Sequence, residues 1–191
     1  MPKKKRMVGA SQLALSNRLQ ASEYSNEADL LAACRRRDVA ALEQLYLTHA
    51  ARLKSIAFHI LRNRQDAEDA VQETFVKLYR GIEGFMGQAN IGTWLCRIVI
   101  NASYDLARKR QRTEEVVSLH SRDERLPLKV VLDDALRRIN PRRRMVFLLF
   151  EVEGLRHSEI AAILEIPEGT SKAWLFEAKQ ELKQLLMETP R

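Results

Sequence analysis

The chain is poor in residues that interrupt helices and in residues that build disulfide frameworks. It has only 7 glycines and 5 prolines among 191 residues, which favours helices over a turn-rich all-β fold. Its two cysteines, Cys34 and Cys96, are too few for a disulfide scaffold and lack the spacing of metal ligands. We therefore expect an all-α protein of the reducing cytoplasm, in which both cysteines are small buried residues.

Long apolar runs and an excess of acid are also missing. No apolar stretch reaches the roughly 18 residues of a membrane span, so we expect no insertion into a membrane. The basic start, residues 1–6, has the charge of a signal peptide, but no apolar segment follows it. The chain has 32 Lys and Arg against 25 Asp and Glu, a net charge of +7. This balance fits a polyanionic partner, although many basic proteins bind no nucleic acid.

Composition along the chain predicts two helical domains, an arm and a linker. Residues 1–25 are polar and basic, which is typical of a mobile arm. Helical patterns fill residues 26–110 and return over residues 128–188. Residues 111–127 are charged and lack a sustained apolar period, so we expect a flexible linker there.

Apolar periodicity and glycine content predict the elements of the first domain. Amphipathic patterns cover residues 27–61 and Asp66–Arg80. Four of the seven glycines lie within residues 81–92, which predicts a loop. Thr93 is the candidate cap of a following helix, expected from Trp94 to about Arg110.

An acidic stripe lies on the helix expected over residues 66–80. Asp66, Asp69 and Glu73 have the spacing i, i+3, i+7 that places three carboxylates on one helix face, with Gln72 beside them. Clustered carboxylates can bind a divalent metal or perform acid–base chemistry. They can equally dock on a basic partner or simply face solvent, and the pattern alone leaves these alternatives open.

Aromatic and cationic residues gather in the loop and helix that follow. Phe85, Trp94 and Tyr104 lie near the basic run Arg108–Arg110. Single-stranded nucleic acid binds such surfaces, because bases stack on rings while Lys and Arg hold the phosphates. Aromatic residues at helical spacing are more often part of a core, so both interpretations stay open.

Residues 154–179 have the pattern of a helix-turn-helix. The first helix is expected to bury Ile160, Ala161 and Leu164. The second is expected from about Pro167 to Met187, since proline suits the first turn of a helix. Its expected buried stripe is Leu175, Ala178, Leu182 and Leu185.

The outward face of the second helix is then Lys172, Ala173, Phe176 and Lys179, the side chains that could contact phosphates and base edges in a major groove. The alternative is an ordinary helical hairpin.

Three blocks resemble, in order and spacing, the extracytoplasmic-function (ECF) sigma factors, the compact two-domain class of bacterial transcription initiation factors. NRQDAEDAVQETFVKLY at 63–79 is similar to the second-region helix that grips the polymerase. FMG at 85–87 and TWLCRIVINA at 93–102 are similar to the loop and helix that open and contact the minus-ten element. GLRHSEIA to PEGTSKAWL, within 154–175, is similar to the fourth-region element that contacts the minus-thirty-five element.

The resemblance implies a role for each matched position. The residues that align with docking on the clamp coiled coil of the polymerase β′ subunit are Asp66, Asp69, Gln72, Glu73 and Phe75. The residues assigned to the minus-ten DNA are Asn90 and Ile91 in the base-pocketing loop, and Trp94, Arg97, Asn101 and Arg108 on the helix behind it. Those assigned to the minus-thirty-five DNA are Arg144, Thr170, Lys172, Ala173, Phe176 and Lys179.

The resemblance also implies partners and excludes chemistry of the chain's own. The partners are core RNA polymerase, through its β′ clamp coiled coil and its β flap, promoter DNA and an anti-sigma factor. Polymerase performs the reaction, so no catalytic residue, metal or cofactor is expected. Two rivals are a transcriptional regulator that never binds polymerase and a metal-dependent nuclease built on the acidic stripe.

Four positions depart from the family's pattern. Met86 stands where relatives commonly have Arg, and Trp174 and Glu177 stand where their recognition helix often has Arg. Glu165 occupies a turn position at which relatives usually have Gly, so it needs a left-handed backbone if the turn is unchanged. Glu177 near phosphates is unfavourable, which predicts either a weaker DNA contact there or an unusual promoter preference.

Overall fold

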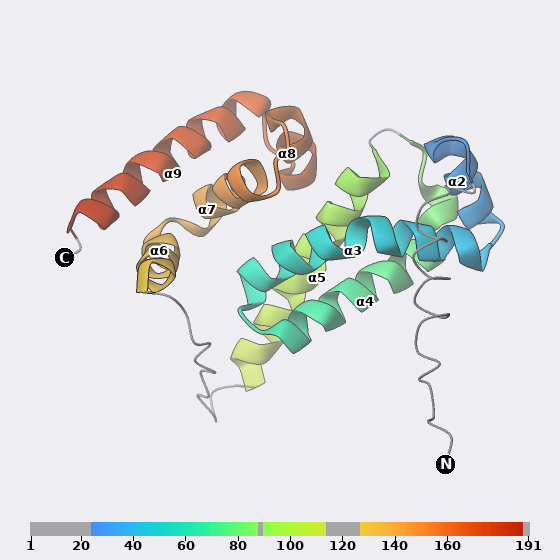
Figure 1. Cartoon of the computed structure of the whole chain (residues 1–191), viewed down its shortest axis with the longest axis horizontal. Coiled ribbons are helices and arrows are strands. Elements are labelled where there is room, and N and C mark those ends of the chain that lie inside the picture. Colours follow the sequence, from blue (N-terminus) through green and yellow to red (C-terminus); the bar gives the residue numbers. More distant parts are fainter. Residues whose placement is uncertain (1–23, 88–89, 114–126, 189–191) are drawn as a thin grey trace, which may run out of the picture. The chain divides into compact units, whose positions relative to one another are not determined.

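The computed structural model describes residues 24–87, 90–113 and 127–188. Every regular element in these ranges is helical, which confirms the all-α prediction (Figure 1). The elements are α2 (Glu27–Arg35), α3 (Val39–Leu61), α4 (Arg64–Gly81), η1 (Ile82–Gly84), α5 (Ile91–Thr113), α6 (Pro127–Arg138), α7 (Pro141–Phe147), η2 (Leu148–Val152), α8 (His157–Leu164) and α9 (Glu168–Glu188).

Two of the predicted segments fall almost wholly outside the described residues: the basic arm 1–25 and the linker 111–127. At the edges of the linker, α5 continues to Thr113 and α6 begins at Pro127. Within the described ranges, no helix combines the length and the apolar character needed to cross a lipid bilayer.

The chain divides into two compact units, Met1–Gln44 and Leu45–Arg191. In the first unit, side-chain caps mark where each helix begins. The Asn26 side chain accepts a hydrogen bond of 2.9 Å from the backbone N–H of Asp29, which caps α2. Asp38 accepts one of 2.9 Å from the N–H of Ala40 at the start of α3. Each cap satisfies an amide that has no partner within its own helix.

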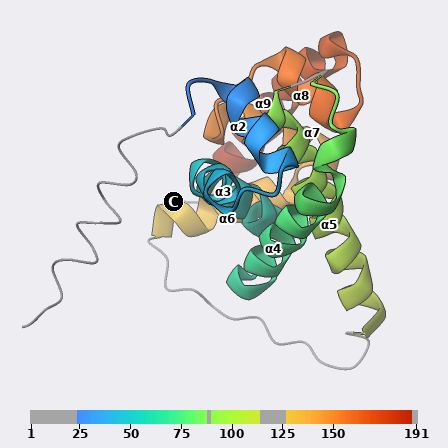
Figure 2. The same cartoon turned by 90° about the vertical axis from the view of Figure 1, so that its right-hand side faces the viewer.

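In the second unit, α4 and α5 pack along one another (Figure 1 and Figure 2). The amphipathic pattern of α4 is borne out by an apolar stripe buried at Ala67, Ala70, Val71 and Leu78. Thr74 is fully buried with it, and its hydroxyl donates to the Ala70 carbonyl at 2.7 Å. This local bond lets a polar residue lie in the interface without losing a hydrogen bond.

The start of α5 differs from the prediction. The helix begins at Ile91, three residues before the expected start, and Asn90 caps it by accepting a hydrogen bond of 2.7 Å from the N–H of Gly92. Thr93, the expected cap, is a buried residue of the first turn, only 7% exposed. A Cβ on residue 92 would lie 3.0 Å from the Asn90 side-chain oxygen and 3.1 Å from His49, so glycine allows this tight cap.

The helix-turn-helix is formed by α8 and α9. Ile160 and Ile163 are the buried residues of α8, whereas Ala161 and Leu164, which were expected inside, are partly exposed. The prediction was therefore right for Ile160 and wrong for Ala161 and Leu164. The predicted stripe of α9 is confirmed, with Leu175, Ala178 and Leu182 buried and Leu185 packed against them. Helix α9 begins at Glu168, directly after Pro167.

Glu165 ends α8 in the left-handed conformation that its sequence position predicts, with φ 55° and ψ 46°. The N–H of Ile166 then donates to the Ala161 carbonyl at 3.1 Å, which closes the end of the helix. A side chain with a Cβ is unfavourable at such a position, so this turn stores backbone strain.

Glu165→Gly is expected to stabilise the fold by roughly 0.5–1 kcal/mol, because relief of the left-handed strain exceeds the entropy that glycine gains in the unfolded chain. Urea unfolding of both proteins measures the difference. Ala162→Gly, on the exposed face of α8, is the matched control and should destabilise by about 1 kcal/mol. A loss of stability in both variants would contradict the strain argument.

Candidate functional site

The acidic stripe of α4 divides into two parts. Asp69 and Glu73 are exposed on the helix surface, and the Glu73 carboxylate lies 3.7 Å from the ammonium of Lys77 on its own helix. Asp66 is half-buried and forms an ion pair with Arg110 of α5. Two of the three carboxylates therefore face outward, while the third ties α4 to α5.

Apolar side chains border the exposed carboxylates. Gln72 is exposed beside Glu73, and Val76 and Tyr79 are 41% and 47% exposed. Phe75 is half-buried, with its ring 5.0 Å from the ring of Tyr46. Val76 and Tyr79 were not predicted as site residues, although apolar residues outside the buried stripe of a helix are a signal in the sequence. Together the exposed residues form a mixed acidic and apolar face.

At the start of α5, the predicted minus-ten residues separate into surface and core. Asn90 is exposed, but Ile91 is only 2% exposed and belongs to the helix, not to the loop in which it was predicted. The ring of Trp94 packs 5.2 Å from that of Phe85, which is 6% exposed. Phe85 is thus a core residue, and Trp94 shows only part of its surface.

Further along α5, three predicted residues face outward. Arg97, Asn101 and Arg108 are all exposed. Arg97 forms an ion pair with Glu165, and Arg108 forms one with Asp105 of its own helix. The cationic side chains therefore lie on the surface of α5, as a DNA-contacting helix requires.

The four predicted residues of the outward face of α9 are exposed, and Phe176 is 65% exposed despite its apolar ring. We call Lys172, Ala173, Phe176 and Lys179 the recognition face. Thr170 is half-buried beside it. Arg144 lies elsewhere: it is half-buried, and its guanidinium donates to the Leu136 carbonyl at 3.5 Å near the end of α6.

Comparison with known proteins decides the family. The Sigma-70 region 2 model matches residues 45–113, and the Sigma-70 region 4 model matches residues 129–182. The ECF RNA polymerase sigma factor SigM of Mycobacterium tuberculosis is 30% identical over 84% of this chain and 85% of its own length. This chain belongs to the ECF sigma factors. It binds core RNA polymerase and directs it to specific promoters.

Other relatives agree with this assignment. RNA polymerase sigma-H factor of Pseudomonas aeruginosa is 26% identical over 79% of this chain and 89% of its own. The solved structure of the sigma factor RpoE with the anti-sigma factor NepR, from Bartonella quintana, has a TM-score of 0.66 at 26% identity, and covers 80% of this chain and 100% of that one. CnrH, solved with the cytosolic domain of CnrY, shares the fold with a TM-score of 0.69 at 24% identity, over 84% of this chain and 97% of its own.

Glu177 does not stand unpaired in this sigma factor. Arg143 of α7 approaches it with 2.7 Å between Nε and Oε2, and also forms an ion pair with Glu181. The expected repulsion between Glu177 and phosphates is therefore reduced by a neighbouring cation. The sequence offered no signal for this pairing, because Arg143 lies on another helix.

Burial keeps two thiols and one imidazole of this sigma factor uncharged. Burial raises the pKa of Cys34 to about 11 and that of Cys96 to about 12, so both thiols stay protonated at neutral pH. Both are buried, as predicted. Burial, with help from Arg62 and Arg144, lowers the pKa of His59 to about 4 and keeps its imidazole neutral.

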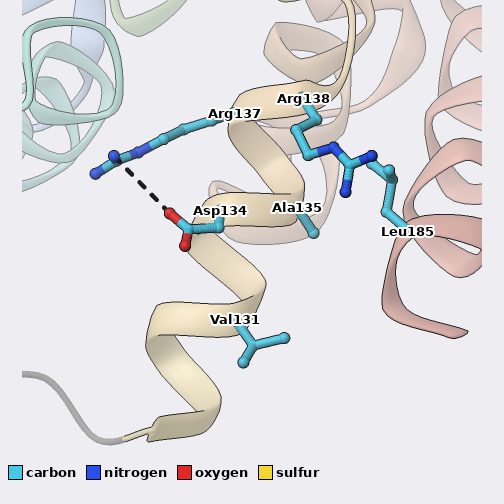
Figure 3. A pocket seen from close by; sticks show the side chains of 6 residues that line it. All are labelled: Val131, Asp134, Ala135, Arg137, Arg138 and Leu185. Atoms are coloured by element: carbon cyan, nitrogen blue, oxygen red, sulfur yellow. Dashed lines mark ion pairs between the residues drawn. The ribbon is translucent and has the colours of Figure 1, made fainter. Parts of the chain in front are cut away.

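In the part of the chain that the structure describes, the acidic stripe of α4 does not assemble a set of metal ligands. Across the described ranges, no three His, Cys, Asp or Glu side chains come together as ligands for a metal ion. A cavity of about 470 Å³ opens between α6 and α9 (Figure 3). Its lining residues are Val131, Asp134, Ala135, Arg137, Arg138 and Leu185. Asp134 forms an ion pair of 3.8 Å with Arg137 at its edge.

Proposed function

We propose that α4 docks on the clamp coiled coil of the β′ subunit through Asp69, Gln72, Glu73 and Phe75. The observation that carries this is the exposed acidic face of α4 beside Val76 and Tyr79. Acidic groups steer a basic partner into position, and the apolar side chains contribute burial in the complex. Asp66, the remaining predicted docking residue, acts at the edge of this surface while it holds Arg110.

The minus-ten element meets the start and the outer face of α5. Asn90 is exposed at the base-pocketing loop directly before α5, where a flipped base would bind. The half-buried ring of Trp94 lies behind it, and its exposed part is available for stacking. Flipping costs a few kcal/mol, least where the duplex is already melting. Arg97, Asn101 and Arg108 contact the strand from the exposed side of the helix. Ile91 acts from within the core, as support for the Asn90 cap.

The minus-thirty-five element meets the recognition face in its major groove. Lysines there contact phosphates or guanine edges, and Ala173 or Phe176 contacts a thymine methyl. Thr170 contacts the phosphate backbone at the border of this surface, and Arg144 contacts it from α7, away from the recognition face.

Further partners follow from the family. Polymerase also binds the fourth region through its β flap, and an anti-sigma factor masks the chain, as NepR binds RpoE in the solved complex. The protein acts in the cytoplasm, where its polymerase works, and has no enzymatic activity, metal or cofactor of its own.

Lys172→Ala is expected to weaken promoter binding by about 1–3 kcal/mol if the ammonium contacts a guanine edge. Holoenzyme binding to a promoter fragment measures this. Lys183→Ala is the matched control, since Lys183 is an exposed lysine of α9 outside the recognition face. If Lys172 contacts only phosphate, its loss should weaken all duplexes alike and lower the salt slope by about one. Equal binding of all three proteins would contradict the assignment of this face.

Run-off transcription with purified core enzyme on a library of genomic fragments tests the whole proposal. A sigma factor yields discrete transcripts, and their start sites reveal the promoter. A regulator that never binds polymerase yields none. A nuclease built on Asp66, Asp69 and Glu73 would cut a plasmid in the presence of magnesium, whereas this protein is expected to leave it intact.

A further inference from the structure

The recognition helix carries less positive charge than its role suggests. Helix α9 contains three lysines and four glutamates, a net charge of −1, in a chain whose net charge is +7. Attraction to phosphates supplies nearly all binding to unrelated DNA. A recognition helix of this composition is therefore weakly drawn to duplexes in general.

The first lysine of the recognition face has a carboxylate partner one turn before it. Lys172 Nζ lies 2.7 Å from Glu168 Oε1, and both side chains are exposed. The pKa of Glu168 is lowered from its usual value, chiefly by the hydrogen bond from Lys172. The carboxylate thus stays ionised beside the lysine at neutral pH.

The second lysine is held from a different element. Lys179 Nζ lies 2.6 Å from Glu151 Oε1, and 5.9 Å from the centre of the Phe150 ring. Both partners belong to η2, a five-residue π-helical turn before α8. The extra residue of a π turn shifts the positions that follow it around the helix axis, and such turns are frequent at functional sites.

Phe150 is itself fixed by its neighbours. Its ring stacks on the imidazole of His157 with 4.6 Å between centroids, and His157 Nδ1 lies 2.9 Å from the hydroxyl oxygen of Ser171. Ser171 is fully buried in the first turn of α9. The chain of contacts therefore links η2 to the recognition helix and defines where Lys179 is held.

We propose that Glu151 and Glu168 are specificity-determining positioning residues, which hold Lys179 and Lys172 in ion pairs and so suppress binding to DNA that lacks the promoter sequence. The inference rests on the proposed contact between the recognition face and DNA. An ammonium has three donors, so each lysine can keep its carboxylate while one N–H is directed to a base edge. A contact with a DNA phosphate depends mainly on the charge of the lysine and not on the direction of one N–H. The carboxylate neutralises that charge, so it weakens phosphate contacts more than base contacts.

The test compares Glu168→Gln, Glu151→Gln and the double variant in the full-length protein. Binding is measured by fluorescence anisotropy across a salt series, on a 30-base-pair random duplex and on a duplex of the minus-thirty-five segment recovered by run-off transcription. Surface ion pairs change equilibria by about twofold to fivefold, so each single variant should bind the random duplex about two to five times more tightly. The salt slope should steepen by about 0.9 for each released lysine. Affinity for the promoter duplex should rise less, so that the preference for promoter over random DNA falls.

Two controls separate this effect from net charge and from structural damage. Asp134→Asn removes the same charge from α6 (Figure 3), and should leave the preference for the promoter unchanged. Glu168→Asp retains the carboxylate and should restore the parent salt slope.

Unchanged random-duplex binding and salt slope in the double variant would overturn the inference, as would an equal effect of Asp134→Asn. If Lys172→Ala leaves all DNA binding unaffected, the proposed recognition face fails and the inference fails with it. If Lys172→Ala weakens promoter binding while the glutamate variants change nothing, only the inference fails.

Discussion

Asp69→Arg is expected to weaken binding to core RNA polymerase by about 100-fold or more. Asp69 is exposed on the acidic face of α4, so the substitution replaces attraction to a basic partner with repulsion, and like charges brought together in an interface cost several kcal/mol. Biolayer interferometry with purified core enzyme measures the affinity, and run-off transcription should fall in parallel.

Glu68→Arg is the matched control for this substitution. Glu68 is the preceding residue on the same helix, but its carboxylate lies 3.1 Å from Lys54 of α3, away from the docking face. The same change of charge there should alter core affinity by less than about fivefold, the scale of an exposed ion pair. Equal losses in both variants, or unchanged affinity in Asp69→Arg, would show that α4 docks through another surface.

Leu149→Ala is expected to lower the free energy of unfolding by about 2–5 kcal/mol, because it leaves a cavity in the core. Leu149 is fully buried in η2, and its carbonyl accepts a hydrogen bond of 3.0 Å from the N–H of Leu155. The loss should also loosen the turn that presents Phe150 and Glu151. Denaturant unfolding followed by circular dichroism measures the change in the free energy of unfolding.

Val152→Ala, in the same π turn, serves as the comparison. Val152 is 52% exposed, so its truncation should change stability by less than about 0.5 kcal/mol. A small effect of Leu149→Ala would mean that η2 is not anchored through this side chain.

Periodicity predicted the long helices well and the short or tightly capped ones less well. The stripe of α9 follows from spacing alone, because a long amphipathic helix has many residues that agree on one face. In α8 only eight residues carry the pattern, so Ala161 and Ile163 were equally good candidates for the inside. At α5, both Asn90 and Thr93 are good capping residues, and burial of Thr93 decided between them.

Charge partners were beyond the reach of the sequence, since they join residues that only the fold brings together. Asp66 meets Arg110 from 44 positions away, and Arg143 meets Glu181 from 38 positions away. The resemblance predicted the candidate DNA-binding and polymerase-binding residues. It could not predict which of them form ion pairs with other parts of the chain. The π turn likewise has no simple signature in residue type, so Glu151 was not predicted to contact Lys179.

The state of the two cysteines bears on how this sigma factor can be controlled. Oxidation to sulfenic acid or a disulfide needs an accessible thiolate, and Cys34 and Cys96 are buried thiols whose raised pKa values keep them protonated. They are the only cysteines in the chain. Neither thiol therefore offers an oxidant the accessible thiolate on which a cysteine-based redox switch depends.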